Sequence, residues 1–283
     1  MSGKIHTCVC RGRRLFKRLC DSFSELVVQP GSGKNDRRQI FNTGKGITVP
    51  AKPTPTKRKI NHPRIRSLAF RLRRKRSGKI IDLIEKIYAG RQEVHIVDVG
   101  GTREYWNIIP VEYLHWRNVH ITLVNISPSE NPPEKHETMF SYMQGDGCRL
   151  EGIADNQFDI AHSNSVIEHV GDWRKMVDFA GEIRRIARLY YVQTPNYFFP
   201  IEPHFLFPFF QWLPFSLKLR LIMRFQLGCF PKAAGEEEAR RYVEMCRLLT
   251  KRRLIHLFPD AELHKEKIFF LAKSFILIRG SLV

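Results

Sequence analysis

VHIVDVGGT, residues 94–102, is a short, mostly β-branched run that stops at a pair of glycines. Such a run predicts a buried parallel strand that ends in a tight turn. Gly100 and Gly101 carry no Cβ, so the turn lets a ligand approach main-chain N–H groups. Asp98 adds a fixed acceptor at the carboxyl end of the strand, the edge at which open α/β sheets bind ligands. The stretch predicts a ligand site, although its Asp-Gly-Gly end is also compatible with a plain turn.

Strand patterns and helix patterns alternate along the rest of the chain. Further strands are predicted at residues 120–126, 138–143, 158–163 and 189–193, and helices at residues 80–89 and 173–188. This alternation predicts a mostly parallel sheet with helices on both faces. The last two strands, at residues 262–269 and 273–279, lie too close together for a crossover helix. We therefore expect them to form an antiparallel hairpin.

The positive charge of the chain is concentrated in its first part. The formal net charge is +19; residues 1–78 hold 21 Lys or Arg and three acidic residues, and residues 79–283 hold 26 and 25. We expect residues 1–78 to form a largely disordered basic arm, with short helices possible at 14–23 and 64–75, before one domain at 79–283. Through the arm alone the protein could bind nucleic acid or an anionic membrane surface; a solvated arm without a partner is the other interpretation.

Residues 198–230 differ in character from the rest of the domain. Their sequence, FFPIEPHFLFPFFQWLPFSLKLRLIMRFQLGCF, is crowded with aromatic residues and prolines, and the prolines exclude one long helix. We expect an insertion of short helices or loops that covers the mouth of the sheet, as a substrate lid, a dimer face or a membrane-surface element. Residues 236–253 then predict one amphipathic helix, acidic in its first turn and basic in its last.

Four strand ends together resemble a known family. They are the Asp98-Val-Gly-Gly-Thr turn, the polar end of the second strand, Gly145-Asp146 after the third, and FDIAHSNSVIEHV at the fourth, residues 158–170. In order and spacing they are similar to class I S-adenosylmethionine-dependent methyltransferases of the type 11 kind, over about residues 80–200. The resemblance implies a Rossmann-like, doubly wound, mostly parallel seven-stranded sheet with a C-terminal antiparallel hairpin, and S-adenosyl-L-methionine as cofactor.

The resemblance also implies which residues bind the cofactor. They are Asp98, Gly100 and Gly101 at its methionine and ribose end, Asn125 at the ribose hydroxyls, Gly145 and Asp146 at the adenine, and Ser163 and Asn164 closing the pocket. Asn125 stands where the family usually has an acidic residue. Its amide accepts from one hydroxyl and donates to the other oxygen, so binding is feasible without a charge-assisted bond.

Methyl transfer requires mainly that the acceptor be positioned, and a base only when the acceptor carries a proton of high pKa. His169 and His204 are the candidate catalytic bases, because an imidazole takes up a proton near neutral pH. His204 is favoured because its segment follows the fifth strand and would project over the cofactor. The alternative is that His169 merely begins a helix and His204 packs among phenylalanines. Candidate substrate-binding residues nearby are Glu168, Asn196 and Glu202.

Cysteine usage predicts a reducing compartment and no metal. The six cysteines show no paired framework, and Cys8, Cys10 and Cys20 lack the further ligands that would complete a metal site. We expect a cytoplasmic protein; the Arg-rich first 20 residues leave organellar import open. There is no run of 18 apolar residues that would predict a membrane-spanning helix.

The sequence favours some methyl acceptors over others. Enzymes that methylate nucleic-acid amino groups often carry an Asn/Asp-Pro-Pro-aromatic motif after the fourth strand, where this chain has Ser163-Asn164-Ser165-Val166. The aromatic insertion instead suits a small molecule, a sugar or polysaccharide-associated acceptor, or a lipid-linked one. The alternative is a non-catalytic binding or scaffold protein on the same fold, using its basic arm to bind RNA or an anionic membrane; Thr102 and Glu104 at later glycine positions of the turn mildly favour it.

Overall fold

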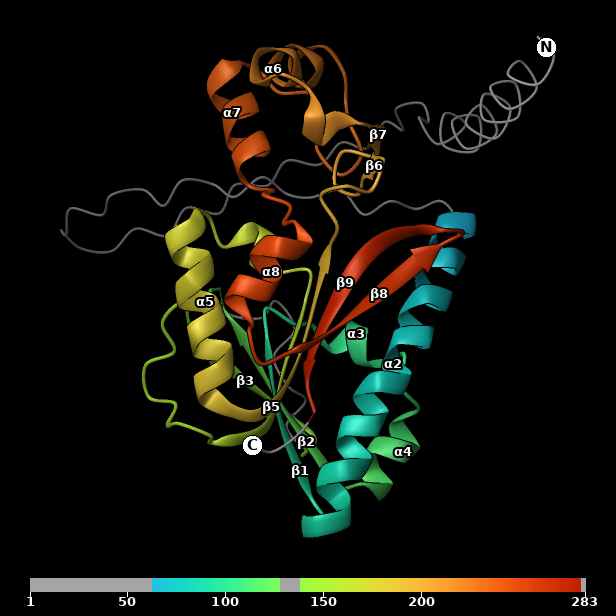
Figure 1. Cartoon of the computed structure of the whole chain (residues 1–283), viewed down its shortest axis with the longest axis vertical. Coiled ribbons are helices and arrows are strands. Elements are labelled where there is room, and N and C mark those ends of the chain that lie inside the picture. The colour runs from blue at the N-terminus through green and yellow to red at the C-terminus, as the bar shows by residue number, and fades with distance from the viewer. Residues whose placement is uncertain (1–62, 128–137, 281–283) are drawn as a thin grey trace, which may run out of the picture. The chain divides into compact units, whose positions relative to one another are not determined.

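The computed structural model describes residues 63–127 and 138–280. They form a seven-stranded sheet in the order β3-β2-β1-β4-β5-β9-β8 (Figure 1). The strands are β1 (Val94–Val99), β2 (Val119–Asn125), β3 (Phe140–Gln144), β4 (Phe158–Asn164), β5 (Ala187–Pro195), β8 (Glu262–Ile268) and β9 (Leu271–Arg279). The pairs among β1 to β5 are parallel, and β9 pairs antiparallel with both β5 and β8. The predicted doubly wound fold with a C-terminal antiparallel hairpin is confirmed.

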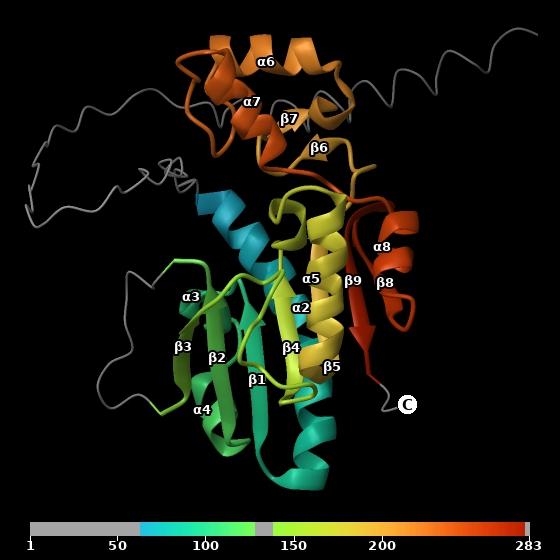
Figure 2. The ribbon, with the colours of Figure 1, turned by 90° about the vertical axis from the view of Figure 1, so that its left-hand side faces the viewer.

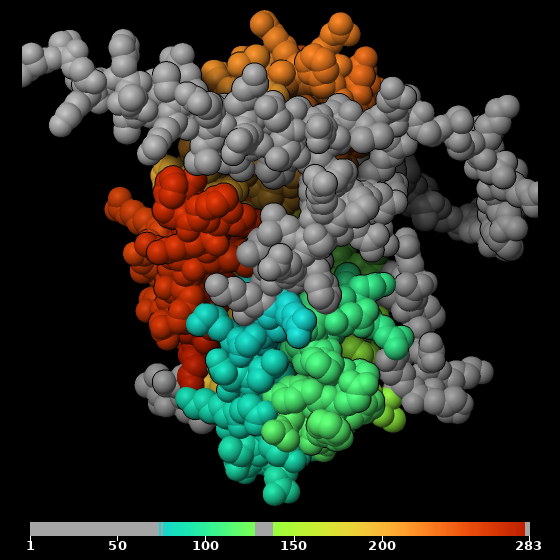
Figure 3. All heavy atoms as spheres, turned by 90° about the vertical axis from the view of Figure 1, so that its right-hand side faces the viewer, coloured from blue at the N-terminus to red at the C-terminus, as the bar shows by residue number. Residues whose placement is uncertain are grey.

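Helices cover both faces of this sheet (Figure 2). One face carries α2 (Pro63–Arg91), α3 (Arg103–Trp106) and α4 (Val111–Trp116), and the other carries α5 (Trp173–Ile186) and α8 (Lys251–Leu257). A separate apolar core fills the space between each helix layer and the sheet. Cover on both faces explains why β1 is buried at five of its six positions instead of at every second one. Figure 3 shows α2 beside the helices that follow β1 on one face of the molecule.

Helix α2 crosses the predicted boundary between arm and domain at residues 78 and 79. The two helical segments predicted at residues 64–75 and 80–89 form one continuous helix. Arg76 and Ser77, which fall within the predicted arm, are buried against the domain. The remainder of the arm, including its cysteines and the helix predicted at residues 14–23, lies outside the described residues.

A cap, residues 197–246, lies over the carboxyl ends of the parallel strands (Figures 1 and 2). It consists of β6 (Ile201–Glu202), β7 (Phe207–Pro208), η2 (Phe210–Trp212), α6 (Phe215–Arg224) and α7 (Glu236–Glu244). The cap has an apolar core of its own, in which Phe205 stacks on both Phe210 and Phe230, and Tyr242 stacks on Phe230. The predicted insertion therefore extends past residue 230 and includes α7. None of the helices in the described part of the chain has the length and apolar character needed to cross a membrane.

The prediction of one helix over residues 236–253 is wrong. Helix α7 ends at Glu244, and α8 begins only at Lys251. Between them the backbone bonds to other parts of the fold: the N–H of Arg247 donates to the carbonyl of Glu168, and the carbonyl of Leu249 accepts from Tyr197. The side chain of Thr250 then caps α8. Tertiary hydrogen bonds replace helical ones in this segment, which sequence periodicity does not reveal.

Candidate functional site

The turn after β1 has no room for side chains. Gly100 has a φ of +75°, and a Cβ there would lie 2.6 Å from Val166 Cγ2. A Cβ on Gly101 would lie 1.8 Å from Asp98 Oδ2, which is far inside van der Waals contact. Both glycines are therefore required by packing within the protein, in addition to the role in cofactor binding predicted from the resemblance.

The carboxylate of Asp98 is fully buried and bonded on both oxygens. Its Oδ1 lies 2.7 Å from Nδ1 of His162, and its Oδ2 accepts a hydrogen bond from Trp106 Nε1 at 2.9 Å. The His162 ring also stacks on Tyr191, with 5.2 Å between ring centroids. Asp98 thus fixes α3 and β4 to the end of β1. Gly100 and Gly101 are half-buried, whereas Asp98 is fully buried. In this turn the glycine backbone is therefore more accessible than the carboxylate.

The ends of β2 and β3 carry Asn125 and Asp146, the two side chains that the resemblance predicts to bind the nucleoside part of S-adenosylmethionine. The amide nitrogen of Asn125 donates to the carbonyl of Gly101 at 2.9 Å. This bond fixes the orientation of the amide and leaves its Oδ1 as a hydrogen-bond acceptor. Asp146 is exposed, and one of its oxygens accepts from the N–H of Cys148. The N–H of Gly145 donates to the carbonyl of Asn125, so the two strand ends are adjacent. An amide oxygen and a carboxylate suit ribose hydroxyls and an adenine amino group, respectively.

The two predicted residues at the end of β4 make bonds within the protein. Ser163 is buried, and its hydroxyl donates to the carbonyl of Val99, which ties β4 to β1. Asn164 is half-buried, and its Oδ1 accepts from Arg76 of α2 at 3.1 Å. Arg76 is itself buried beside Glu266, with 3.1 Å between Nε and Oε1. Of the two side chains, that of Asn164 is the more exposed.

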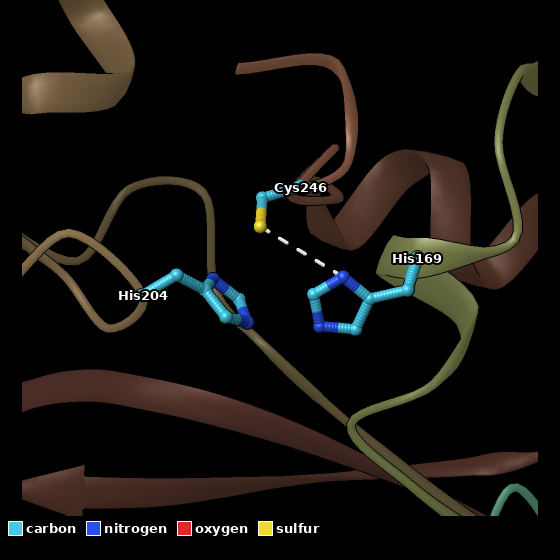
Figure 4. A group of neighbouring side chains, drawn as sticks. All are labelled: His169, His204 and Cys246. Atoms are coloured by element: carbon cyan, nitrogen blue, oxygen red, sulfur yellow. Dashed lines mark hydrogen bonds between the residues drawn. The ribbon is translucent and has the colours of Figure 1, made fainter. Parts of the chain in front are cut away.

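The two candidate bases, predicted from distant parts of the sequence, lie side by side (Figure 4). His169 ends η1 (Ile167–His169), which follows β4, and His204 lies in the turn between β6 and β7 of the cap. Their ring centroids are 4.7 Å apart and the rings are nearly perpendicular. Nδ1 of His204 lies 2.7 Å from Glu202 Oε1. Burial lowers the pKa of His204, but hydrogen bonds to Cys246 and Glu202 outweigh it, so the pKa lies well above its usual value.

The three predicted substrate-binding residues are all buried and engaged within the protein. Glu168 accepts a hydrogen bond from the hydroxyl of Thr194 on β5. Asn196 donates to the carbonyl of Ala272 and accepts from the N–H of Phe198. Glu202 accepts from the N–H groups of the two residues that follow Pro203, and from the His204 ring. Of the three, Glu202 orients His204, and direct contact of any of them with an acceptor remains a prediction.

Three residues of the site were not predicted from the sequence. His162 is the partner of Asp98, Arg76 reaches the end of β4, and Cys246 lies within hydrogen-bonding range of the histidine pair. His162 sits within the predicted fourth strand, so its burial on a sheet covered on both faces was foreseeable. Arg76 and Cys246 come from segments predicted as a disordered arm and as a continuous helix, and no local signal places them here.

Comparisons with known proteins find similarity over part of this chain. Residues 109–189 match the family model described as a methyltransferase domain. Two uncharacterized proteins of Mycobacterium tuberculosis are 38% identical to this chain over 64 residues, which is 22% of the chain and 22% of each relative. The matched stretch therefore spans about a fifth of the length of these relatives.

Solved structures give weaker likenesses. An S-adenosylmethionine-dependent methyltransferase of Methanosarcina mazei superposes with a TM-score of 0.40 at 13% identity, covering 66% of this chain and 92% of that one. An O-methyltransferase family protein of Burkholderia thailandensis gives a TM-score of 0.38 at 10% identity, covering 77% and 60%. The matched domain and the topology of the sheet confirm the family resemblance seen in the sequence, and the cofactor that this domain implies is S-adenosyl-L-methionine.

Proposed function

The chain carries a class I S-adenosylmethionine-dependent methyltransferase domain, and on that premise we propose that it methylates a hydroxyl group of a small-molecule, glycan-associated or lipid-linked acceptor. One observation carries the proposal. His169, which follows β4, and His204, which belongs to the aromatic cap, lie side by side at the carboxyl end of the parallel strands (Figure 4). A polar pair under an apolar cover is the arrangement that an acceptor with an apolar body and a reactive hydroxyl requires.

The protein's own residues then hold and orient the two reactants. When bound, the cofactor supplies a methyl carbon that is already activated by its sulfonium. Asn125 and Asp146 hold the nucleoside, and the turn at Gly100 allows the close approach of the rest of the cofactor. The cap excludes water from the acceptor, and the histidine pair contacts its hydroxyl. Most of the rate enhancement therefore comes from positioning.

The exposed aromatic residues of the cap support the choice of acceptor. Large apolar side chains reach solvent on its surface: Phe198, Phe209, Trp212, Phe215 and Phe225. Phe209 and Trp212 stack on each other with 5.3 Å between ring centroids. Exposed aromatic rings of this kind offer flat apolar faces to a sugar ring or an acyl chain.

Calorimetric titration of S-adenosylhomocysteine into the full chain tests the cofactor side of the proposal. We expect saturable binding that Asn125→Ala and Asp146→Ala each weaken about tenfold, the effect of one lost hydrogen bond. The exposed Asp178→Ala on α5 is the matched control and leaves the affinity unchanged. Transfer of a radioactive methyl group to sugar and lipid acceptors then tests the acceptor class. A folded chain that does not bind the cofactor product would contradict the proposal.

A non-catalytic binding protein is the second candidate. It is favoured by Asp98, whose two oxygens are both bonded to buried partners. In this alternative the domain serves as a scaffold, and the basic arm binds RNA or an anionic membrane. The titration distinguishes the two candidates, because a scaffold has no need for S-adenosylhomocysteine.

A further inference from the structure

Three side chains from separate segments meet on the acceptor side of the site. They are His169 after β4, His204 in the cap and Cys246 in the break between α7 and α8 (Figure 4). One imidazole nitrogen from each histidine and the sulfur all lie within 4.8 Å of one another. All three residues are half-buried. Two imidazoles and a thiol are the ligand types that zinc and related transition metals prefer.

Each histidine of this cluster is oriented by an acceptor on its Nδ1. Nδ1 of His169 lies 2.6 Å from the main-chain carbonyl of Met245, and Nδ1 of His204 lies 2.7 Å from Glu202 Oε1. A carbonyl or a carboxylate only accepts, so Nδ1 carries the proton in both rings and Nε2 bears the lone pair of the neutral form. Histidines that bind metals commonly donate their other N–H to a carboxylate or a backbone carbonyl in this way.

The carboxylate behind His204 is fixed in place. Glu202 is 2% exposed, and its second oxygen accepts from the main-chain N–H groups of His204 and Phe205. The sulfur of Cys246 lies 3.8 Å from Nδ1 of His169, so it sits at the edge of that ring. The cluster therefore consists of two oriented imidazoles with a thiol beside them.

A second half-buried cysteine, Cys148, has surroundings that differ from those of Cys246. Cys148 donates to the carbonyl of Lys175, and no histidine ring is among its contacts in the described residues. Burial and the nearby Asp146 raise the pKa of the Cys148 thiol to about 12. The combination of a thiol with two histidines occurs at Cys246 and not at Cys148, which makes Cys148 a matched control.

We propose that His169, His204 and Cys246 bind one divalent transition-metal ion, zinc by the chemistry of the set. Binding displaces the thiol proton of Cys246 to solvent, so that a thiolate and two neutral imidazoles hold the ion. Tetrahedral zinc requires ligand atoms about 3.3–3.7 Å apart, which small side-chain rotations from the present separations provide. Three protein ligands leave one position of a tetrahedral ion for an exchangeable ligand, as in catalytic zinc sites.

This site deepens the proposed function and, in its role, rests on it. An acceptor hydroxyl in the fourth position would be oriented beside the cofactor and would lose its proton more readily. His169 and His204 then act as metal ligands in place of direct proton acceptors. The sequence predicted no metal, because residues 169, 204 and 246 are far apart and belong to no recognisable spacing.

Cobalt titration of the chelator-treated full chain tests the site. We expect one Co²⁺ per chain, with the visible bands of tetrahedral cobalt and a thiolate charge-transfer band, and displacement by Zn²⁺. Cys246→Ser abolishes the charge-transfer band, His204→Ala weakens binding at least 100-fold, and Glu202→Gln, which only orients His204, weakens it about 10- to 100-fold. Cys148→Ser and His264→Ala leave binding unchanged; His264 is half-buried and pairs with the exposed Glu262 on β8.

Two further measurements distinguish the proposed site from metal binding elsewhere in the chain and from loss of folding in a variant. A full chain with Cys8, Cys10 and Cys20 replaced by Ser retains binding if the site is the one proposed. X-ray absorption of the zinc-loaded wild type gives one sulfur and two nitrogen ligands without relying on any variant. Absence of stoichiometric binding, or an unchanged thiolate band in folded Cys246→Ser, overturns the proposal. If the chain binds S-adenosylhomocysteine but no metal, only the metal site is contradicted. If it binds the metal but no S-adenosylhomocysteine, the methyltransferase proposal is contradicted.

Discussion

Asp98 is the residue on which the turn after β1 depends most. Its buried carboxylate accepts from Trp106 and His162, and its Oδ2 occupies the space where a side chain at position 101 would lie. Nε2 of His162 is also buried and has no hydrogen-bond partner among the described residues. The local network therefore has few other ways to satisfy its donors if the carboxylate is removed.

We predict that Asp98→Ala lowers the free energy of unfolding by about 2–4 kcal/mol, because two buried donors lose their acceptor. Urea unfolding followed by circular dichroism measures the effect. The exposed Asp82→Ala on α2 is the control, with an expected change within about 0.5 kcal/mol. Equal effects of the two substitutions would mean that the buried network contributes little. Because Asp98→Ala perturbs the fold, it is a poor probe of cofactor contact.

Asn125 is an amide for a reason visible in the structure. Its nitrogen donates to the carbonyl of Gly101, a bond that a carboxylate cannot make. We predict that Asn125→Asp, although it restores the acidic residue usual in the family, weakens S-adenosylhomocysteine binding about tenfold, because two oxygens then face each other beside the turn. Calorimetry measures the affinity, with the exposed Asn107→Asp as control. Tighter binding by Asn125→Asp would show that the bond to Gly101 is dispensable.

For single residues, the sequence predicted their positions at the strand ends but not the side chains that they contact. Asp98, Gly100 and Asn125 do lie at the strand ends where they were expected. The pairing of Asp98 with His162 depends on the register between β1 and β4, which aligns these two residues directly. Register between strands far apart in sequence is a property of the assembled sheet, so it was not available from local patterns.

Glycines in two elements allow a matched comparison. Gly101 has no space for a Cβ, whereas Gly181 in α5 has no heavy atom within 4 Å of one. We predict that Gly101→Ala destabilises the protein by about 2–3 kcal/mol or more, through the forced movement of Asp98. Gly181→Ala should stabilise it by about 0.5–1 kcal/mol, because alanine favours the helix. Thermal unfolding of both variants checks the two signs, and destabilisation by Gly181→Ala would contradict this account of α5.

The turn between α8 and β8 is attached to two strands by one carboxylate. Asp260 accepts from Tyr190 on β5 at 2.6 Å and from Arg279 on β9 at 3.0 Å. Burial raises the pKa of Asp260, but these two partners outweigh it and hold the pKa below its ordinary value. A carboxyl with a lowered folded pKa stabilises the protein above its unfolded pKa, and that contribution is lost as pH falls through the folded value.

We therefore predict that Asp260→Asn destabilises the protein at neutral pH and that its difference from the wild type shrinks below about pH 4. Urea unfolding of both proteins at neutral and acidic pH measures this convergence. The exposed Asp178→Asn is the control and should show a small difference at every pH. A difference between wild type and Asp260→Asn that does not change with pH would mean that packing, not charge, is what the substitution removes.

Most elements could be predicted from the sequence, because their periodicity reflects local packing. The five parallel strands and α5 were placed within a few residues of their observed bounds. The break between α7 and α8 was missed because its backbone bonds to Glu168 and Tyr197, which lie about 50 to 80 positions earlier in the chain. That break is what places Cys246 beside the histidines.

For the whole domain, the N-terminal limit lies before Arg76, and not between residues 78 and 79 as the composition predicted. Arg76 contacts Glu266, and Glu266 also accepts from Ser274. We predict that a chain beginning at residue 79 is at least about 3 kcal/mol less stable than one beginning at residue 63, because a buried carboxylate loses its arginine. Urea unfolding compares the two, and Arg76→Met in the full chain should reproduce most of the loss. Equal stability of the two truncated chains would restore the boundary expected from composition.

The mostly parallel sheet and the helix layers on both of its faces followed from the alternation of strands and helices, which is a property of the whole sequence; the order of the strands was not predicted. The separate core of the cap did not follow, since aromatic crowding alone does not distinguish a loop that covers the sheet from a small folded unit. The stacking of Phe205 between Phe210 and Phe230 shows that the cap has a hydrophobic core of its own.

The chain enters and leaves the cap at neighbouring points of the sheet, which affects how readily the cap can be replaced in evolution. The chain leaves β5 at Asn196 and returns at Leu249, and these two residues pair with each other while Tyr197 donates to the Leu249 carbonyl. Both ends of the cap therefore meet at one point of the sheet edge. We expect a unit with its own core and adjoining ends to tolerate replacement or a change of length with little effect on the strands beneath it. Under the proposed function, this would let the choice of acceptor diverge while the sheet stays the same.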